Sequence, residues 1–293
     1  MNKSVSTHYS VVLFVLAILA SIAFHFAPQF AWYISGVLAL IGLTLVGIPH
    51  GALDVLTHTS RTNHVHPILF LSTYIASVSL VICGWFFIPT ATLAFFLLLS
   101  AWHFGQADFE LWKLKRGSMC WGTLLLIIIL GWHLEEVNSI LSAIGVSEAV
   151  LSLVIKAEFW IKNGTIIGWM IALALAIYRR KKPWFWSLML LACTPLLPVL
   201  IAFMFFFIGQ HSVAGWMHLK RGLKLNDRQL WIKAAPFHLG AWAIIGVGVY
   251  SLGINESQTF HATVGWFFAF LGSISIPHIV ESHRFIQNLR EHS

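Results

Sequence analysis

The stretch GIPHGALD, residues 47–54, ends a long apolar run with an imidazole, a carboxylate four residues later and a helix-kinking proline. If the helix continues past the proline, His50 and Asp54 share one of its faces, and the carboxylate can orient the imidazole as a hydrogen-bond acceptor. A membrane helix with a polar cap looks the same, so this stretch alone leaves both interpretations open. A histidine followed within a few residues by an acidic residue also occurs in HFGQAD, residues 103–108, and in IPHIVE, residues 276–281. The repetition favours a metal site built from several helices.

The composition excludes a soluble globular fold. Of the 293 residues, 58% are hydrophobic and only 10% are charged, and the mean hydropathy is +0.80. A chain of this length cannot bury so much apolar surface in one soluble core, so it must be an integral membrane protein. The three cysteines have no paired or CxxC spacing and are interpreted as small buried hydrophobes. The net charge of +7 belongs to short loops, where it indicates topology rather than nucleic-acid binding.

Ten apolar segments predict an all-α, polytopic integral membrane helix bundle with about ten transmembrane segments, within a range of eight to ten. The seventh segment is the weakest, because the prolines of residues 194–198 also suit one long bent helix. No linker interrupts the chain, so residues 1–293 are predicted to form a single integral membrane catalytic domain. The segments are residues 10–26, 31–50, 66–88, 90–111, 119–133, 160–178, 183–195, 198–219, 229–253 and 262–283.

Lysine and arginine predict the orientation in the membrane. They gather in alternate loops and near both termini, whereas the opposite loops contain few basic residues. Cytoplasmic loops are enriched in Lys and Arg, so both termini are expected in the cytoplasm, joined by an even number of spans. The stretch from Glu135 to Lys162 is an exception and is interpreted as interfacial amphipathic helix on the outer side. The chain is predicted to be a multi-pass protein of the inner (plasma) membrane.

Four of the 15 histidines are predicted to lie at one depth in the inner half of the membrane. Each falls past the middle of an even-numbered segment, and a rise of 1.5 Å per residue puts it roughly 20–28 Å below the outer surface. An ionisable side chain inside the bilayer indicates a functional site. Neutral imidazoles with few carboxylates suit Fe(II), Zn(II) or Cu, so the four are candidate ligands of one ion. These residues are His50, His103, His211 and His278.

Other titratable residues receive subordinate roles. Asp54 and Asp108 are predicted to accept hydrogen bonds from the distal N–H of the ligands. Glu281 is better explained as a helix-end group in the cytoplasmic interface. His238 lies at mid-depth and His218 lies about 10 Å beyond the third candidate ligand, so both are alternates. The remaining histidines are interpreted as solvated or interfacial: His8, His25, His58, His64, His66, His133, His261, His283 and His292.

Aromatic residues accompany the candidate ligands. Trp102 lies beside one histidine, residues 204–207 precede His211, and residues 266–268 lead toward His278. Such walls suit a flat, long apolar ligand that enters from lipid. Aromatic residues of membrane spans also serve in packing or face lipid, so this feature alone does not identify a substrate.

Four motifs resemble those of the Brp/Blh family of membrane β-carotene dioxygenases. The first two are specific and the last two are looser, and all occur in the family's order. The resemblance runs from about residue 40 to residue 285. The motifs are PHGALD at residues 49–54, HFGQAD at 103–108, QHS at 210–212 with HLK at 218–220, and PH at 277–278.

The resemblance implies a non-haem Fe(II) enzyme that uses O₂ to split the central 15,15' double bond of β-carotene into two all-trans-retinal molecules. The family has a second histidine shortly after its His-Ser pair, but here Gly215 stands four residues on and the next imidazole is His218. The fourth ligand is therefore open between His278 and His218, and depth favours His278. The residues that take the family's other iron-ligand roles are His50, His103 and His211.

The same resemblance implies partners. They are the apolar carotenoid, O₂, the lipid bilayer and a rhodopsin that accepts retinal, and nucleic acid is not among them. Three other function classes stay open, one of which is a non-catalytic retinoid- or haem-binding membrane protein. A different histidine-rich metalloenzyme, such as a di-iron lipid desaturase or hydroxylase, would use clustered HxxxH and HxxHH patterns, but no HxxHH occurs here. A proton-coupled transporter would relay protons through buried histidines, but these cluster at one depth instead of forming a ladder.

Overall fold

The computed structural model describes residues 3–61, 67–253 and 260–291, and nearly all of them are helical. A helix bonds its backbone N–H and C=O groups within its own segment, which is what a bilayer requires of a spanning chain. No strand occurs in these three ranges, so the all-α prediction is confirmed for them. Proline marks several helix starts, because its missing N–H is not needed in the first turn.

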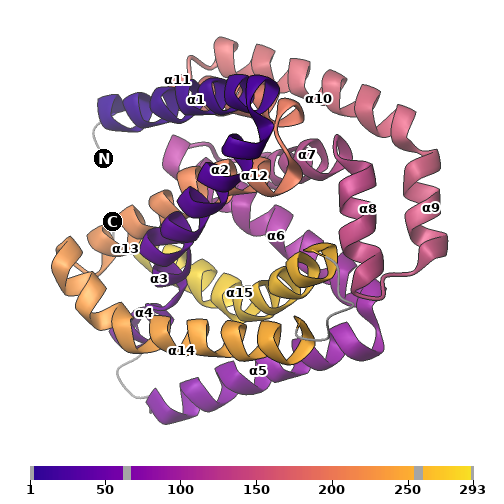
Figure 1. Cartoon of the computed structure of the whole chain (residues 1–293). Coiled ribbons are helices and arrows are strands. Elements are labelled where there is room, and N and C mark those ends of the chain that lie inside the picture. The colour runs from indigo at the N-terminus through magenta and orange to yellow at the C-terminus, as the bar shows by residue number, and fades with distance from the viewer. Residues whose placement is uncertain (1–2, 62–66, 254–259, 292–293) are drawn as a thin grey trace.

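Figure 1 shows the helices along the chain, from indigo at the N-terminus to yellow at the C-terminus. Of the three elements marked η, the first and third are π-helices and the second is a 3₁₀ turn. The elements are α1 (Lys3–Phe26), α2 (Pro28–Gly42), η1 (Leu43–Gly47), α3 (Ile48–Gly51), α4 (Asp54–Arg61), α5 (Pro67–Phe87), α6 (Pro89–Trp112), α7 (Ser118–Gly131), α8 (Leu134–Ala143), α9 (Glu148–Lys156), α10 (Glu158–Tyr178), α11 (Lys182–Cys193), η2 (Thr194–Leu196), α12 (Val199–Met204), η3 (Phe205–Ser212), α13 (Val213–Gly222), α14 (Asp227–Gly253) and α15 (Phe260–Glu291).

Helices α6 and α15 run through the centre of the bundle. α6 packs along α7, and α15 packs against α4, α5, α6, α8 and α14. In Figure 1, α1, α10 and α11 lie on one side of these central helices, and α5 and α14 lie on the other. Large side chains such as Phe104, Trp121 and Phe206 fill the space around α6. The central helices carry His103 and His278, which are 4% and 9% exposed.

Helices α6 and α7 approach so closely that only glycine fits between them. A Cβ atom on Gly105 would lie 1.8 Å from the Ser118 carbonyl oxygen. A Cβ atom on Gly122 would lie 1.7 Å from the Ala101 carbonyl oxygen. Small residues allow this kind of backbone contact between membrane helices. Gly105 and Gly122 thus allow the two backbones to touch.

Six described helical stretches are long and apolar enough to cross a membrane, and a seventh is added if α7 and α8, which meet at 89°, count as one span. α6 has the length of a span, but His103, Gln106 and Asp108 lower its hydropathy. The apolar helices indicate a membrane protein, whereas the count of about ten spans stays a prediction. The six stretches are residues 8–26, 28–61, 68–87, 158–178, 199–222 and 261–288.

Two irregular regions of the sequence take definite forms. The prolines of residues 194–198 break the helix, because the turn η2 is followed by extended backbone at Leu197, with φ −118° and ψ 152°. The stretch predicted as interfacial helix contains the short helices α8 and α9 and the first turn of α10. α8 buries Leu134 and Ile140 and exposes Glu135, as an amphipathic helix does. The side of the membrane on which it lies stays a prediction.

A candidate metal centre beside an apolar cavity

Two π-helical segments position His50 and His211. η1 directly precedes α3, and the Ile48 N–H donates to the Leu43 carbonyl oxygen, five residues back. The next residue, Pro49, has no N–H, so a regular α-helical ladder cannot run through this point. η3 contains His211, and η1 packs against η3. These wider turns therefore bring together two imidazoles from distant parts of the chain.

Four imidazoles lie together in the centre of the bundle, one each from α3, α6, η3 and α15. Measured between ring centroids, His103 lies 4.7 Å from His211 and 5.5 Å from His278. His50 lies 5.0 Å from His278 and 5.7 Å from His211. All four residues are buried. The structure thus gathers the four histidines that the sequence places at one membrane depth.

The spacing and surroundings of these rings suit a shared ion. Imidazoles bound to one ion at about 2.1 Å have ring centroids about 4.6–5.3 Å apart in cis or tetrahedral arrangements. Both ring nitrogens of His103 and Nδ1 of His211 are buried without a hydrogen-bond partner in the part of the chain that the structure describes. Native structures rarely leave buried polar atoms in this state unless they serve a function.

The donor atoms themselves are not yet arranged around one point. Within residues 3–61, 67–253 and 260–291, no three His, Cys, Asp or Glu side chains have the geometry that holds a metal ion. Of the four ring separations given above, 4.7 and 5.0 Å fall within the range for a shared ion, and 5.5 and 5.7 Å exceed it.

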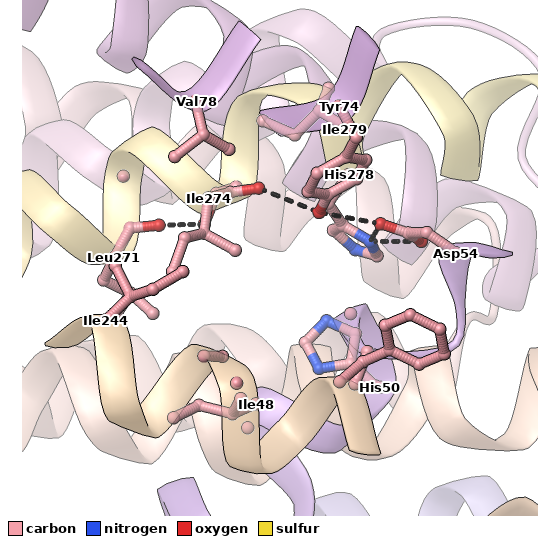
Figure 2. A pocket seen from close by; sticks show the side chains of 18 of the residues that line it. Ile48, His50, Asp54, Tyr74, Val78, Ile244, Leu271, Ile274, His278 and Ile279 are labelled. Carbon is pink, nitrogen blue, oxygen red and sulfur yellow. Dashed lines mark hydrogen bonds and ion pairs between the residues drawn. The ribbon is translucent and has the colours of Figure 1, made fainter. Parts of the chain in front are cut away.

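Asp54 contacts His278 rather than His50. A turn separates α3 from α4, which begins at Asp54, so no continuous helix joins His50 to this carboxylate, and the prediction that Asp54 orients His50 is wrong. His278 Nδ1 lies 2.9 and 3.1 Å from the two Asp54 oxygens. The Tyr74 hydroxyl donates to Asp54 Oδ2 at 3.1 Å, and Figure 2 shows this chain of contacts above the His50 ring. His50 Nδ1 instead lies 3.2 Å from the Val46 carbonyl oxygen.

Asp108 is fully buried and bonds to groups other than imidazoles. Its Oδ2 accepts a hydrogen bond from Trp121 Nε1 at 2.7 Å and another from Gln210 Nε2 at 3.0 Å. Gln210 in turn accepts a hydrogen bond from the Ser187 hydroxyl at 2.8 Å. The predicted hydrogen bond from a ligand histidine to Asp108 is therefore not the one observed. The carboxylate instead holds the residue that directly precedes His211.

The two alternate histidines differ in their positions. His218 lines a small cavity of about 30 Å³ together with the four clustered histidines, so it lies beside the cluster. His238 packs between Trp231 and Trp242, with ring centroids 5.8 and 6.4 Å away. It lines neither this cavity nor the larger one described below. His218 therefore remains an alternate, and His238 belongs to a separate aromatic contact.

Glu281 and His58 are buried among protein side chains rather than solvated, and their depth in the membrane stays a prediction. Glu281 is 2% exposed and forms an ion pair with Arg61 at 3.0 Å. His58 is 7% exposed and stacks on Phe70 with ring centroids 4.1 Å apart, and its Nδ1 lies 3.5 Å from Glu281. A buried carboxylate needs such partners, because its desolvation is costly. The ion pair joins α4 to α15 one turn after His278.

The sequence analysis assigned no role to three polar residues that support the site: Tyr74, Ser187 and Gln210. Tyr74 and Ser187 are isolated polar residues in apolar helices, and such residues usually have a partner when they are buried. Their partners lie in other helices, so spacing along the chain cannot identify them. Gln210 has a clearer signal, because it directly precedes His211 in the QHS motif.

An apolar cavity of about 510 Å³ adjoins the clustered histidines. Its volume is typical of ligand pockets, which are about 300–1,000 Å³. Phe203, Phe207 and Phe268 line the part next to His211, and the Phe203 ring lies 5.2 Å from Phe207 and 5.1 Å from Phe268. Aliphatic side chains line much of the rest, as Figure 2 shows for four of them: Ile48, Val78, Ile244 and Leu271.

The expected aromatic walls are thus present in part. Phe207 and Phe268 belong to the predicted stretches 204–207 and 266–268 and line the cavity. Trp102 does not line it, and its ring instead packs against His283, with centroids 4.6 Å apart. The cavity has the character of a site for a long apolar ligand.

Comparison with known proteins agrees with this character. The sequence model of the β-carotene 15,15'-dioxygenase family matches residues 41–283, a range that includes all four clustered histidines. A β-carotene 15,15'-dioxygenase from uncultured marine bacterium 66A03 is 24% identical over 260 residues, covering 83% of this chain and 90% of the relative. No solved structure matches the chain. The chain therefore belongs to the β-carotene 15,15'-dioxygenase family and is a carotenoid-cleaving dioxygenase.

Proposed function

We propose that the protein is a non-haem Fe(II) dioxygenase that cleaves the central 15,15' double bond of β-carotene. Each carbon of that bond receives one oxygen atom, so one O₂ and one β-carotene give two molecules of all-trans-retinal without a further oxidant or reductant. The observation that carries the proposal is the group of four buried imidazoles beside an apolar cavity. A set of neutral imidazoles suits Fe(II) and leaves coordination positions open.

The chain's own residues have separate roles in this reaction. His50, His103, His211 and His278 would hold the iron, and the iron when bound would activate O₂ beside the polyene. Asp54 would keep His278 in one orientation and make it a better donor. The cavity would bind the polyene by burying its apolar surface, and it would exclude water from the reacting bond.

Metal analysis combined with product identification tests the proposal. The full-length wild type, expressed in β-carotene-producing cells, should bleach them, yield retinal and contain one iron per chain. His103→Ala should lose bleaching and iron together, because it removes a donor rather than a packing contact. His25→Ala is the matched control, since His25 is exposed and lies outside the cluster, and it should bleach like the wild type.

Three kinds of result would contradict the proposal. Full activity of His103→Ala, or of wild-type protein stripped of iron, would remove the metal from the reaction. Two irons per chain would favour the di-iron desaturase or hydroxylase alternative. Unchanged orange cells with normal protein levels would point to a carotenoid-binding protein or a transporter.

The proposal extends to the cellular setting. A carotenoid substrate partitions into lipid, so we place the enzyme in the inner (plasma) membrane as a multi-pass protein. Its product is an aldehyde that forms a Schiff base with a lysine amine, and a rhodopsin is the class of protein that would accept it.

A further inference from the structure

The larger cavity lies between two helices that form separate walls. α5 and α14 both pack closely against α15, but among the described residues they make little or no contact with each other. Both helices lie on the same side of the bundle in Figure 1. Tyr74, Ile75 and Val78 of α5 line the cavity, as do Ala241 and Ile244 of α14. α15 therefore forms the floor between these two walls.

Several lining residues are also exposed on the outer surface of the bundle. Leu71 and Ile75 of α5 are 38% and 55% exposed, and Ile244 of α14 is 48% exposed. Gly240 lines the cavity and is exposed as well. Residues that belong both to a cavity wall and to the outer surface mark an opening. Their apolar character means that this opening faces hydrocarbon rather than water.

We propose that the gap between α5 and α14 is a lateral portal through which the carotenoid passes from the bilayer to the clustered histidines. This inference rests on the proposed function, because it assigns the portal to the substrate of that reaction. The cavity extends from Ile75 and Ile244 at the portal to His50 and His278, and farther to Phe207. One continuous apolar route thus leads from lipid to the candidate metal centre.

The chemistry of the walls favours a neutral hydrocarbon over a phospholipid. Among the described residues that line the cavity, none is a lysine or an arginine, and Asp54 is the acidic one. A phosphate group would meet no cation there, and the Asp54 carboxylate would repel it. A polyene without charge needs no such partner. Ser79 and Ser275 are small hydroxyl residues that leave room beside a long ligand.

Gly240 allows the portal to be closed by one substitution. A Cβ atom on Gly240 meets nothing within 4 Å, so Gly240→Trp adds an indole in open space without a clash against the backbone. Gly246 lies on the same helix, is exposed and has equally open surroundings, but it does not line the cavity. Gly246→Trp is therefore the matched control. Ser79→Trp obstructs the portal from α5, and Ala76→Trp, exposed and away from the cavity, is its control.

The test uses the full-length iron-loaded proteins in vesicles that contain β-carotene. Four quantities are measured: β-carotene retained by the repurified protein, phospholipid retained by it, the initial rate of retinal formation, and iron per chain. Gly240→Trp and Ser79→Trp should each place an indole where the carotenoid must pass. Both the amount of β-carotene retained and the rate of retinal formation should therefore fall by about tenfold or more. Iron content should not change, and both control variants should stay within about twofold of the wild type.

The outcomes separate the portal from the reaction. If both portal variants retain β-carotene and form retinal like the wild type, the portal is wrong. If the wild type retains phospholipid in place of β-carotene, the assigned occupant is wrong. If the wild type retains β-carotene, Gly240→Trp does not, and no retinal forms, the portal stands and the proposed reaction fails.

Discussion

The Tyr74 hydroxyl forms a hydrogen bond to Asp54, the carboxylate that contacts His278. It donates to Asp54 Oδ2 at 3.1 Å, and the Ile274 carbonyl oxygen lies 3.2 Å from the same hydroxyl. Tyr74→Phe removes this donor without changing the ring, and one such bond contributes about 1 kcal/mol. We expect iron affinity, measured by competition with a chelator, to fall about fivefold as the carboxylate loses its support. Tyr33→Phe, at an exposed tyrosine, should leave the affinity unchanged.

Equal affinities of Tyr74→Phe and wild type would show that Asp54 keeps its orientation without the hydroxyl. His278 would then depend on the carboxylate alone. The chelator competition reports metal binding, so it separates this positioning role from any direct contact between the Tyr74 ring and the carotenoid.

Asp108 is expected to contribute to stability through its two donors. Asp108→Ala would leave Trp121 Nε1 and Gln210 Nε2 buried and unpaired, and each unpaired group costs about 1–3 kcal/mol. The midpoint of thermal unfolding in detergent should fall by several degrees. Asp108→Asn keeps an acceptor oxygen, so its unfolding midpoint should fall less than that of Asp108→Ala. Asp227→Ala removes a mostly exposed carboxylate that pairs with Lys220 and serves as the control with little effect. Equal losses in all three variants would exclude the network as the cause.

The contact between α6 and α7 makes a prediction about two helices rather than one side chain. Gly105→Ala or Gly122→Ala would drive a methyl group into the carbonyl of the facing helix, where nothing flexible can yield. Either change should separate the helices and destabilise the protein by about 3 kcal/mol or more. The level of folded protein in membranes and its thermal unfolding midpoint measure this effect. Gly164→Ala has open space around it and should match the wild type.

Normal folding of Gly105→Ala would mean that α6 and α7 can separate without cost. In that case the close approach would not fix the position of His103, which lies two residues before Gly105 on α6.

The helices were largely predictable because apolar runs and proline mark them directly in the sequence. The break after η2, for example, falls where two prolines remove backbone donors. The π-helices were not predictable, since a widened turn depends on how η1 packs against η3. The turn between Gly51 and Asp54 was also missed, although it changes the partner of the carboxylate.

The grouping of the four histidines was predictable, but the partners of the buried carboxylates were not. Counting residues along helices placed His50, His103, His211 and His278 in one layer, because helix rise is nearly constant. Hydrogen bonds between helices carry no such regularity. Asp54 meets His278 across 224 positions of sequence, and Asp108 meets Gln210 across 102. Spacing within one helix suggested His50 as the partner of Asp54, whereas the structure pairs Asp54 with His278, another of the four candidate ligands.

The whole chain has a topology that reporter fusions can measure. The distribution of lysine and arginine predicts that both termini face the cytoplasm. A fluorescent protein that folds only in the cytoplasm should therefore be bright at either terminus, and a phosphatase active only outside should be silent there. A fusion within the Glu135–Lys162 stretch should give the opposite pattern. An active phosphatase at one terminus, with a bright fluorescent protein at the other, would indicate an odd number of spans.

The gap between α5 and α14 also affects how the enzyme's kinetics should be expressed. A site that opens sideways into hydrocarbon meets its substrate by two-dimensional diffusion, so the governing concentration is the mole fraction of carotenoid in the bilayer. Fusing the vesicles with carotenoid-free lipid should slow turnover while the amount of carotenoid per litre stays constant. Diluting the same vesicles with buffer should leave the rate per enzyme unchanged.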